Sequence, residues 1–282
     1  MISIEGFTRP FKISISMDGN IACLTKSPTI KLYVFLKNGE YYCKNIFDIG
    51  ISDCTNLTFN NKNEIALIDN KNCRLCLYSM ELNQISNLDL PGSKYGTLHY
   101  DKNNEYFYLS VLDLSIILKI SSNCSASSIF FDYSKIKDCK NVNGLAVKNN
   151  SLILLDTSQS ALFEIILGKS KNNFRRYLEY GRSGIGKVRQ PSDVIIFNNQ
   201  IVIIDKHNYL IQFFDLKLKF TEQIGEKGPG INQFDLPVSA CEYEEELYIC
   251  DQNNDRIVCL DNNKIFNLVI TNKFKEGVLR RP

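Results

Sequence analysis

The feature that most limits how this chain can fold is an internal repeat. Its two clearest copies lie near the end of the sequence: QPSDVIIFNNQIVIIDKHNYLIQFFDLKLKFTEQIG begins at Gln190 and LPVSACEYEEELYICDQNNDRIVCLDNNKIFNLVIT begins at Leu236. Each copy reads as four short apolar runs separated by polar turns, and its second run ends in aspartate. The pattern recurs four more times upstream, beginning at Pro10, Thr55, Gly96 and Val142.

The spacing of the repeats points to one architecture. We assign the end of the second run, in chain order, to Thr25, Asp69, Ser110, Asp156, Asp205 and Asp251. A four-stranded propeller blade needs about 40–50 residues and must stack on its neighbours to bury both faces. The runs are rich in β-branched and aromatic residues and show no sustained helical period. The sequence therefore predicts an all-β, six-bladed β-propeller of four-stranded antiparallel blades.

The repeats fill almost the whole chain, so we expect a single propeller domain over 1–282 with a basic C-terminal tail at 273–282. The expected repeats span 7–51, 52–91, 92–135, 136–186, 187–232 and 233–272. The run ISIEGF precedes the first repeat. By its position in the repeat, we expect Ile2–Ile4 to lie beside the last blade and help to close the ring.

Composition narrows the classes of partner and the compartment. The net charge of +2 argues against a chain that is basic throughout, so any nucleic-acid binding would need a local patch. Apolar runs such as Ile201–Ile204 are far too short to span a bilayer. The first residues, MISIEGFTRPF, lack the basic and apolar segments of a secretory signal. We therefore expect a cytoplasmic protein without membrane association.

The ten cysteines are expected to be reduced and to bind no metal. Several stand inside apolar alternation, where a thiol acts as a small hydrophobic group. Cys73 and Cys76 form a CxxC motif, but their odd spacing in a strand directs them to opposite faces. No second CxxC or histidine pair completes a zinc site.

The repeat resembles the NHL family. The segment GEKGPGINQFDLP (Gly225–Pro237) is similar to its glycine-spaced linker ending in Phe-x-x-Pro, and GFTRP (Gly6–Pro10) keeps the end of that linker. DQNNDRIVCLD (Asp251–Asp261) resembles its Asp-x-x-Asn-x-Arg-Ile core, and Asp69, Asn72 and Arg74 match it in the second repeat. The fifth repeat has Leu210 in place of the arginine. The resemblance implies a propeller fold, and members of such families bind peptides, proteins or RNA, or resemble enzymes.

The repeated aspartates have a structural interpretation. Asx side chains accept hydrogen bonds from turn N–H groups, so Asp69, Asp156, Asp205 and Asp251 are expected to cap the turns between the second and third strands.

The expected channel lining offers little chemistry. Aligned by repeat, it would carry a ring consisting of Lys12, Asn56, Thr97, Gly144, Asp193 and Ser239. One carboxylate and one amide are too few for calcium, which usually takes six to eight oxygens. The two histidines, His99 and His207, are too few for the zinc lyases that share this fold, and we expect one to be packed and the other exposed. No GxSxG, HExxH or phosphate-binding loop is present. We therefore expect no catalytic residue, metal or cofactor.

Topology separates the charges. The blade linkers and the second-to-third-strand turns emerge on one face, here called the top face, and the other turns emerge on the bottom face. The linkers and turns of the top face are rich in lysine and arginine, whereas the acidic run Glu242–Glu246 belongs to the bottom. We expect binding at the top through basic residues, two loop aromatics and the channel mouth: Arg9, Lys12, Lys71, Tyr95, Arg182, Lys187, Arg189, Asp193, Lys206, His207, Tyr209 and Lys227.

These observations favour a non-catalytic recognition module whose top face binds a protein or an acidic or extended peptide. In one version of this hypothesis, the propeller is an accessory subunit of an enzyme. Two alternatives stay open. The same face would suit RNA through phosphate contacts, and a lactonase-like or lyase-like enzyme would place a site at the channel mouth.

Overall fold

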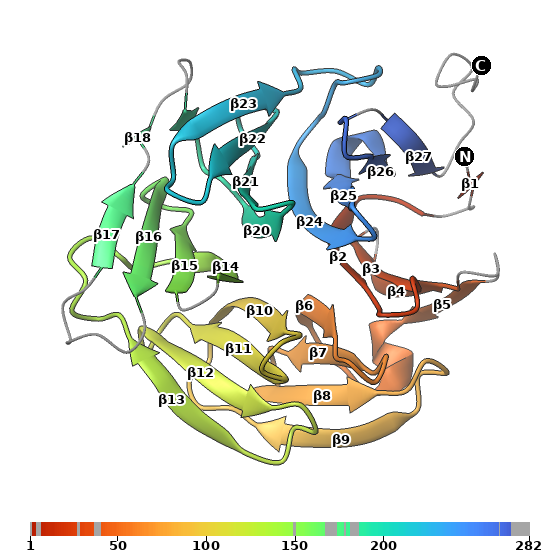
Figure 1. Ribbon diagram of the computed structural model, residues 1–282. Coiled ribbons are helices and arrows are strands. Elements are labelled where there is room, and N and C mark those ends of the chain that lie inside the picture. The colour runs from red at the N-terminus through yellow and green to blue at the C-terminus, as the bar shows by residue number, and fades with distance from the viewer. Residues whose placement is uncertain are drawn as a thin grey trace.

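The computed structural model describes residues 2–3, 7–26, 29–36, 41–148, 151–166, 174–177, 179–180, 186–264 and 266–271. Five four-stranded sheets and one five-stranded sheet are arranged in a ring, as Figure 1 shows. This arrangement confirms the predicted six-bladed β-propeller. The only helical turns in the described part are the 3-10 segments η1 (Ile46–Ile49) and η2 (Gln252–Asn254), so none of its helices has the length needed to cross a bilayer.

Each blade runs from its innermost strand to its outermost strand in chain order. Blade 1 contains β2 (Pro10–Ile15), β3 (Ile21–Lys26), β4 (Ile30–Phe35) and β5 (Tyr41–Asn45). Blade 2 contains β6 (Cys54–Phe59), β7 (Ile65–Asp69), β8 (Arg74–Tyr78) and β9 (Gln84–Asp89). Blade 3 contains β10 (Tyr95–Asp101), β11 (Tyr106–Val111), β12 (Ile116–Ser121) and β13 (Ser127–Asp132).

The second half of the chain repeats this order. Blade 4 contains β14 (Val142–Lys148), β15 (Ser151–Asp156), β16 (Ala161–Ile166) and β17 (Phe174–Tyr177). Two short strands, β18 (Glu179–Tyr180) and β19 (Lys187–Val188), pair between blades 4 and 5. Blade 5 contains β20 (Asp193–Phe197), β21 (Gln200–Asp205), β22 (Leu210–Asp215) and β23 (Phe220–Ile224). Blade 6 contains β24 (Pro237–Tyr243), β25 (Glu246–Asp251), β26 (Arg256–Leu260) and β27 (Phe266–Thr271).

The hydrophobic core is divided into six clusters, one at each interface between neighbouring blades. The alternation of each strand explains this division, because successive side chains point to opposite faces of the sheet. The CxxC motif follows the same rule. Cys73 packs with the cluster between blades 2 and 3, and Cys76 packs with the cluster between blades 1 and 2. This confirms that the two thiols face opposite ways.

The linker phenylalanines close two of these interfaces. Phe234 is fully buried between blades 5 and 6, and Phe7 is fully buried between blades 6 and 1. Phe7 contacts Tyr33 and Phe35 edge-on, with ring centroids 5.2 and 5.9 Å apart. The Phe-x-x-Pro sequence is thus a packing element at the point where the chain enters a new blade.

The predicted capping of the turn after the second strand is seen for Asp69, which accepts the Asn72 N–H, and for Asp156, which accepts the Ser158 and Gln159 N–H groups. Asp205 and Asp251 bind the side-chain amides of Asn208 and Asn254 in that turn instead. All four aspartates are fully buried, and each accepts a hydrogen bond from a backbone N–H of the linker that enters its own blade. The donors are Ser52 for Asp69, Lys140 for Asp156, Arg189 for Asp205 and Asp235 for Asp251. Asp251 also accepts hydrogen bonds from Asn254 and Arg256, both at 2.8 Å. These aspartates therefore join the linker to the blade.

One assignment in blade 3 is wrong by a residue. Val111 pairs with Ile116 at the position where Asp69 pairs with Arg74, so Val111 and not Ser110 is the equivalent of the aspartates. Valine cannot cap a turn, and Asp113 instead accepts hydrogen bonds from Ser93 N–H and Oγ at 2.8 and 2.9 Å. Ser110 Oγ donates to the Val142 carbonyl. The polar residue next to the true strand end produced the shift.

The ring closes with a strand from the N-terminus. β1 (Ile2–Ser3) pairs in parallel with β27, with Ile2 opposite Ile270 and Ser3 opposite Thr271. Blade 6 therefore has five strands, in the order β1-β27-β26-β25-β24. This confirms the predicted pairing for Ile2, while Ile4 and the basic tail at 273–282 lie outside the described residues.

Candidate functional site

The channel is lined by the innermost strands β2, β6, β10, β14, β20 and β24 (Figure 1). The six ring residues predicted from the sequence, one on each innermost strand, lie at one level of the channel. In every blade, the residue that follows the ring residue pairs with the same repeat position of the second strand. Those partners are Cys23, Leu67, Leu109, Leu154, Ile203 and Ile249. The sequence alignment therefore placed the upper channel ring correctly.

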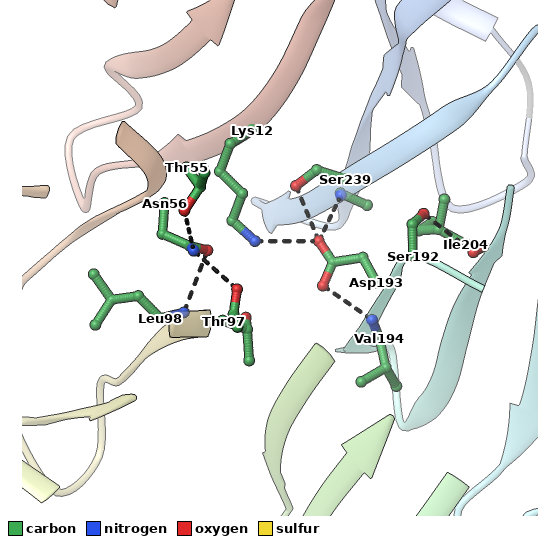
Figure 2. Close-up of polar contacts among 12 residues, drawn as sticks. Lys12, Thr55, Asn56, Thr97, Leu98, Ser192, Asp193, Val194, Ile204 and Ser239 are labelled. Atoms are coloured by element: carbon green, nitrogen blue, oxygen red, sulfur yellow. Dashed lines mark hydrogen bonds and ion pairs between the residues drawn. The ribbon is translucent and has the colours of Figure 1, made fainter. Parts of the chain in front are cut away.

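Asp193 is the centre of the polar contacts at this level (Figure 2). Its Oδ2 lies 3.4 Å from Lys12 Nζ and accepts hydrogen bonds from Ser239 Oγ at 2.9 Å and the Ala240 N–H at 3.3 Å. Its Oδ1 accepts from the Val194 N–H at 3.0 Å. Both carboxylate oxygens are thus used by the protein, and a lysine balances their charge.

This ring does not fit a divalent cation. Calcium requires a set of oxygen ligands that usually includes several carboxylates. Asn56 is used in the fold, because its Nδ2 donates to the Gly96 carbonyl and its Oδ1 accepts from the Leu98 N–H. Within the described residues, no three His, Cys, Asp or Glu side chains lie close enough together to hold a metal ion.

From this level toward the bottom face, the innermost strands line a cavity of about 320 Å³. Its wall includes half-buried residues two positions further along four innermost strands: Ser14, Thr58, His99 and Cys241. Apolar side chains such as Val147, Ile195 and Ile196 complete the wall. A pocket of this size lies at the small end of the range for ligand sites, which begins at about 300 Å³.

This cavity was not predicted from the sequence. The two histidines were expected to be one packed and one exposed residue, and the repeats were compared at only one level of the channel. A search two residues further along each innermost strand would have found His99 and Cys241 together.

His99 and Cys241, two titratable side chains of the cavity wall, are both uncharged at neutral pH. Burial is the main cause that lowers the pKa of His99 to about 4, and the cations of Lys12 and Lys102 act in the same direction while Asp101 and Asp193 oppose them. Burial also raises the pKa of the Cys241 thiol well above its usual value. At neutral pH the imidazole is therefore uncharged and the thiol is protonated, so Cys241 is a poor nucleophile.

An ion pair crosses the bottom mouth of the cavity. Lys102, from the turn after β10, lies 3.5 Å from Glu242 of β24, so the pair joins blades 3 and 6 on opposite sides of the ring. Both side chains are 44% exposed. A pair this exposed contributes about 0–1 kcal/mol and is easily opened.

The top face presents most of the predicted binding residues, although Tyr95 differs from expectation. Tyr95 is only 8% exposed, packs between blades 2 and 3 and donates its hydroxyl to the Gly92 carbonyl at 3.1 Å. The prediction of an exposed aromatic is therefore wrong there, because Tyr95 opens the innermost strand and its ring points into the core. Lys12 and Asp193 are engaged inside the channel. Arg182 lies outside the described residues.

The remaining predicted residues form two groups. Arg9 and Lys71 are exposed and stand on separate blades. The others gather above blade 5 and are called here the blade-5 patch: Lys187, Arg189, Lys206, His207, Tyr209 and Lys227.

Two contacts link members of the blade-5 patch in pairs. The His207 N–H donates to the Arg189 carbonyl at 3.3 Å, and Lys227 Nζ lies 5.2 Å from the centre of the Tyr209 ring. Burial lowers the pKa of Lys206, and burial together with the charges of Lys206 and Arg189 lowers the pKa of His207. Neither Lys206 nor Arg189 forms an ion pair with any residue that the structure describes.

The acidic groups of the top face are mostly engaged by the fold. The aspartates that end the second strands are buried, and Asp255 accepts the Arg9 N–H at 2.8 Å. Asp113 caps the linker before blade 3, and Glu226 accepts a hydrogen bond from Gln233 at 2.8 Å. Asp138 is exposed and stands apart from these contacts. These carboxylates keep their charge, but the described lysines and arginines of the top-face linkers and turns outnumber them, so the net charge of that face is positive.

No family model and no curated protein matches the sequence. Among solved structures, the chain is similar to a catalytically inactive virginiamycin B lyase from Staphylococcus aureus with quinupristin, at 13% identity and a TM-score of 0.63 over 98% of this chain and 88% of that one. An auxiliary nutrient binding protein from Bacteroides thetaiotaomicron gives 13% identity and a TM-score of 0.70 over 89% and 68% of the two chains. A nidogen/laminin complex gives 12% identity and a TM-score of 0.62 over 93% and 92%. At such identities the likeness supports the propeller fold alone.

Proposed function

We propose that this protein is a non-catalytic recognition module, an NHL-like propeller whose top face binds an acidic or extended segment of a protein partner. The observation that carries the proposal is that the acidic and basic side chains of this face differ in how many contacts they make within the protein. Most carboxylates of this face accept hydrogen bonds from linkers and turns, whereas Arg189, Lys206 and Lys227 form no ion pair with another residue that the structure describes. Such a surface attracts acidic partners and speeds their association.

Lys206 is the strongest anchor within the patch. It is half-buried between Asp205 and His207, and burial lowers its pKa. A partner carboxylate would stabilise this charge without displacing an existing ion pair. Tyr209 and Lys227 beside it offer an aromatic surface and a second cation for an extended chain.

The NHL-like character rests on how the motif residues act. Arg256 donates to the linker carbonyls of Pro229, Gly230 and Gln233, at 2.8, 3.1 and 2.7 Å. In blade 5, where Leu210 replaces the arginine, Gln212 Nε2 donates to both Asp205 and the Lys187 carbonyl at 2.7 Å. The motif thus positions the linkers that carry the top-face cations, which suits a binding surface and requires no reaction.

Fluorescence anisotropy can test the chemistry of the partner. The probes are a labelled polyglutamate peptide, a polylysine peptide of equal length and single-stranded polyuridine RNA. We expect polyglutamate to bind and polylysine not to bind. Equal binding of the two peptides contradicts the proposal. If the RNA binds more tightly than polyglutamate, with an affinity that falls steeply as salt rises, the top face is an RNA-binding surface and the proposal is wrong.

A further inference from the structure

The channel cavity faces away from the surface assigned to the partner, so it calls for a separate explanation. We propose that it binds a small uncharged molecule carrying hydroxyl or amide groups, which enters from the bottom face past the Lys102–Glu242 ion pair. The ligand would be no larger than a monosaccharide or a nucleoside, given the cavity of about 320 Å³.

His99 supplies the first reason. Its side chain lines the cavity, and its imidazole has no hydrogen-bond partner among the described residues. A neutral imidazole offers one donor and one acceptor. Because the imidazole nitrogens reach the open space of the cavity, a hydroxyl or amide of a ligand can take the place of water on both of them.

The balance of charge supplies the second reason. Lys12 is paired with Asp193, and Lys102 is paired with Glu242. The Asp101 carboxylate accepts hydrogen bonds from the Asn103 N–H and from Asn104 Nδ2, at 3.0 and 2.6 Å. Since both lysines of the described wall are already paired with a carboxylate, an anionic ligand would lose its hydration without gaining a free counter-ion.

The walls supply the third reason. Val147, Ile195 and Ile196 give the cavity an apolar side, while His99, Thr58 and Ser14 lie on other strands. This division suits a molecule with one apolar face and one edge of hydroxyl or amide groups.

The mouth explains how such a molecule could enter. The Lys102–Glu242 pair is half exposed and contributes little to stability, so it can open without loss of the fold. A closed pair would still slow entry, because the two side chains cross the mouth from opposite blades.

Histidine NMR tests the proposal directly, since His99 and His207 are the only histidines. The full chain is titrated with a panel of uncharged monosaccharides and nucleosides, and with uronic acids and nucleoside monophosphates as charged counterparts. We expect at least one uncharged compound to shift the His99 resonance saturably while His207 stays still. If no uncharged compound moves His99, or if the charged counterparts bind as tightly, the proposal is wrong.

Two variants sharpen this result. His99→Leu should weaken binding of the identified compound at least tenfold, whereas Ser128→Ala, on the exposed outermost strand of the same blade, should not. Lys102→Met should speed association about two- to fivefold, in line with the small energy of an exposed pair. Unchanged affinity in His99→Leu overturns the role of His99, and unchanged kinetics in Lys102→Met overturns the entry route. These readouts lie in the channel and stay separate from partner binding at the top face.

Discussion

At the scale of single residues, Arg256 is the side chain on which the linker into blade 6 most depends. It is 5% exposed and pairs with the fully buried Asp251 at 2.8 Å. Replacing it by methionine leaves a buried carboxylate without its partner, which typically costs about 3–5 kcal/mol. We expect Arg256→Met to lower the free energy of unfolding by that amount, measured by urea denaturation.

Arg74 is the matched control for Arg256. It occupies the same motif position in blade 2 and pairs with Asp69, but it is 28% exposed and donates to one linker carbonyl, that of Gly50. We expect Arg74→Met to cost on the order of 1.5 kcal/mol. Equal losses in the two variants would show that burial does not set the strength of this contact.

His99 makes a second prediction, on pH. Its pKa is lowered to about 4, below the unfolded value near 6.5, so the unfolded state binds a proton first as pH falls. The stability advantage of the neutral imidazole is present above pH 6.5 and is lost between about 6.5 and 4. The raised pKa of Asp205, about 6, acts in the opposite direction over an overlapping range.

A comparison of wild type with His99→Asn removes the contribution of Asp205, because both proteins keep it. We expect the stability of wild type relative to the variant to fall by roughly 2–3 kcal/mol between pH 7 and pH 4. Chemical denaturation at several pH values measures this difference. A difference that does not change with pH would mean that His99 titrates normally in the folded protein.

At the scale of elements, the linker phenylalanines decide how firmly neighbouring blades join. Phe234 is fully buried, whereas Phe47 in η1 is 60% exposed. We expect Phe234→Ala to lower the free energy of unfolding by about 3–5 kcal/mol, because it leaves a cavity between blades 5 and 6. Phe47→Ala should change it by less than about 0.5 kcal/mol. Similar losses in both variants, measured by urea denaturation, would contradict this role for the linker.

The elements also show what the sequence could predict. The blade count, the innermost strands and the capping aspartates followed from a strong local signal, a polar residue after an alternating apolar run. The signal misled at Ser110, where Val111 ends the strand and Asp113 takes over the cap. The environment predicted for Tyr95 was also wrong. This residue follows a polar linker and was interpreted as a loop residue, but it is the first residue of β10 and its side chain packs in the core.

The cavity was harder to predict, because it is a property of the ring and not of one repeat. His99, Cys241, Lys102 and Glu242 come from blades on opposite sides of the channel, and their proximity depends on the level that each residue occupies. Departures from the repeat, such as a histidine in one innermost strand, were visible in the sequence. Their convergence required the radius and register of the assembled ring.

At the scale of the whole molecule, ring closure depends on the short parallel pairing of β1 with β27. Removing residues 1–5 exposes the edge of blade 6. We expect this deletion to lower the melting temperature by several degrees, because a loss of about 1 kcal/mol shifts it by about 2–4 °C at this size. Deleting residues 273–282 should change it little. A larger effect of the C-terminal deletion, measured by thermal denaturation, would place the latch at the other end of the chain.

The central claim is that partners bind the basic top face, and quantitative affinity capture from the native host tests it most directly. One variant carries Gln at Arg189, Lys206 and Lys227, in the blade-5 patch. A matched variant carries Gln at Lys62, Lys217 and Lys219, exposed lysines in bottom-face turns, and so removes the same charge. With both variants folded as judged by melting temperature, we predict that the bottom-face variant recovers the same partners as wild type, while the top-face variant recovers at least fivefold less. Equal recovery by the top-face variant, or loss confined to the bottom-face variant, would contradict the account.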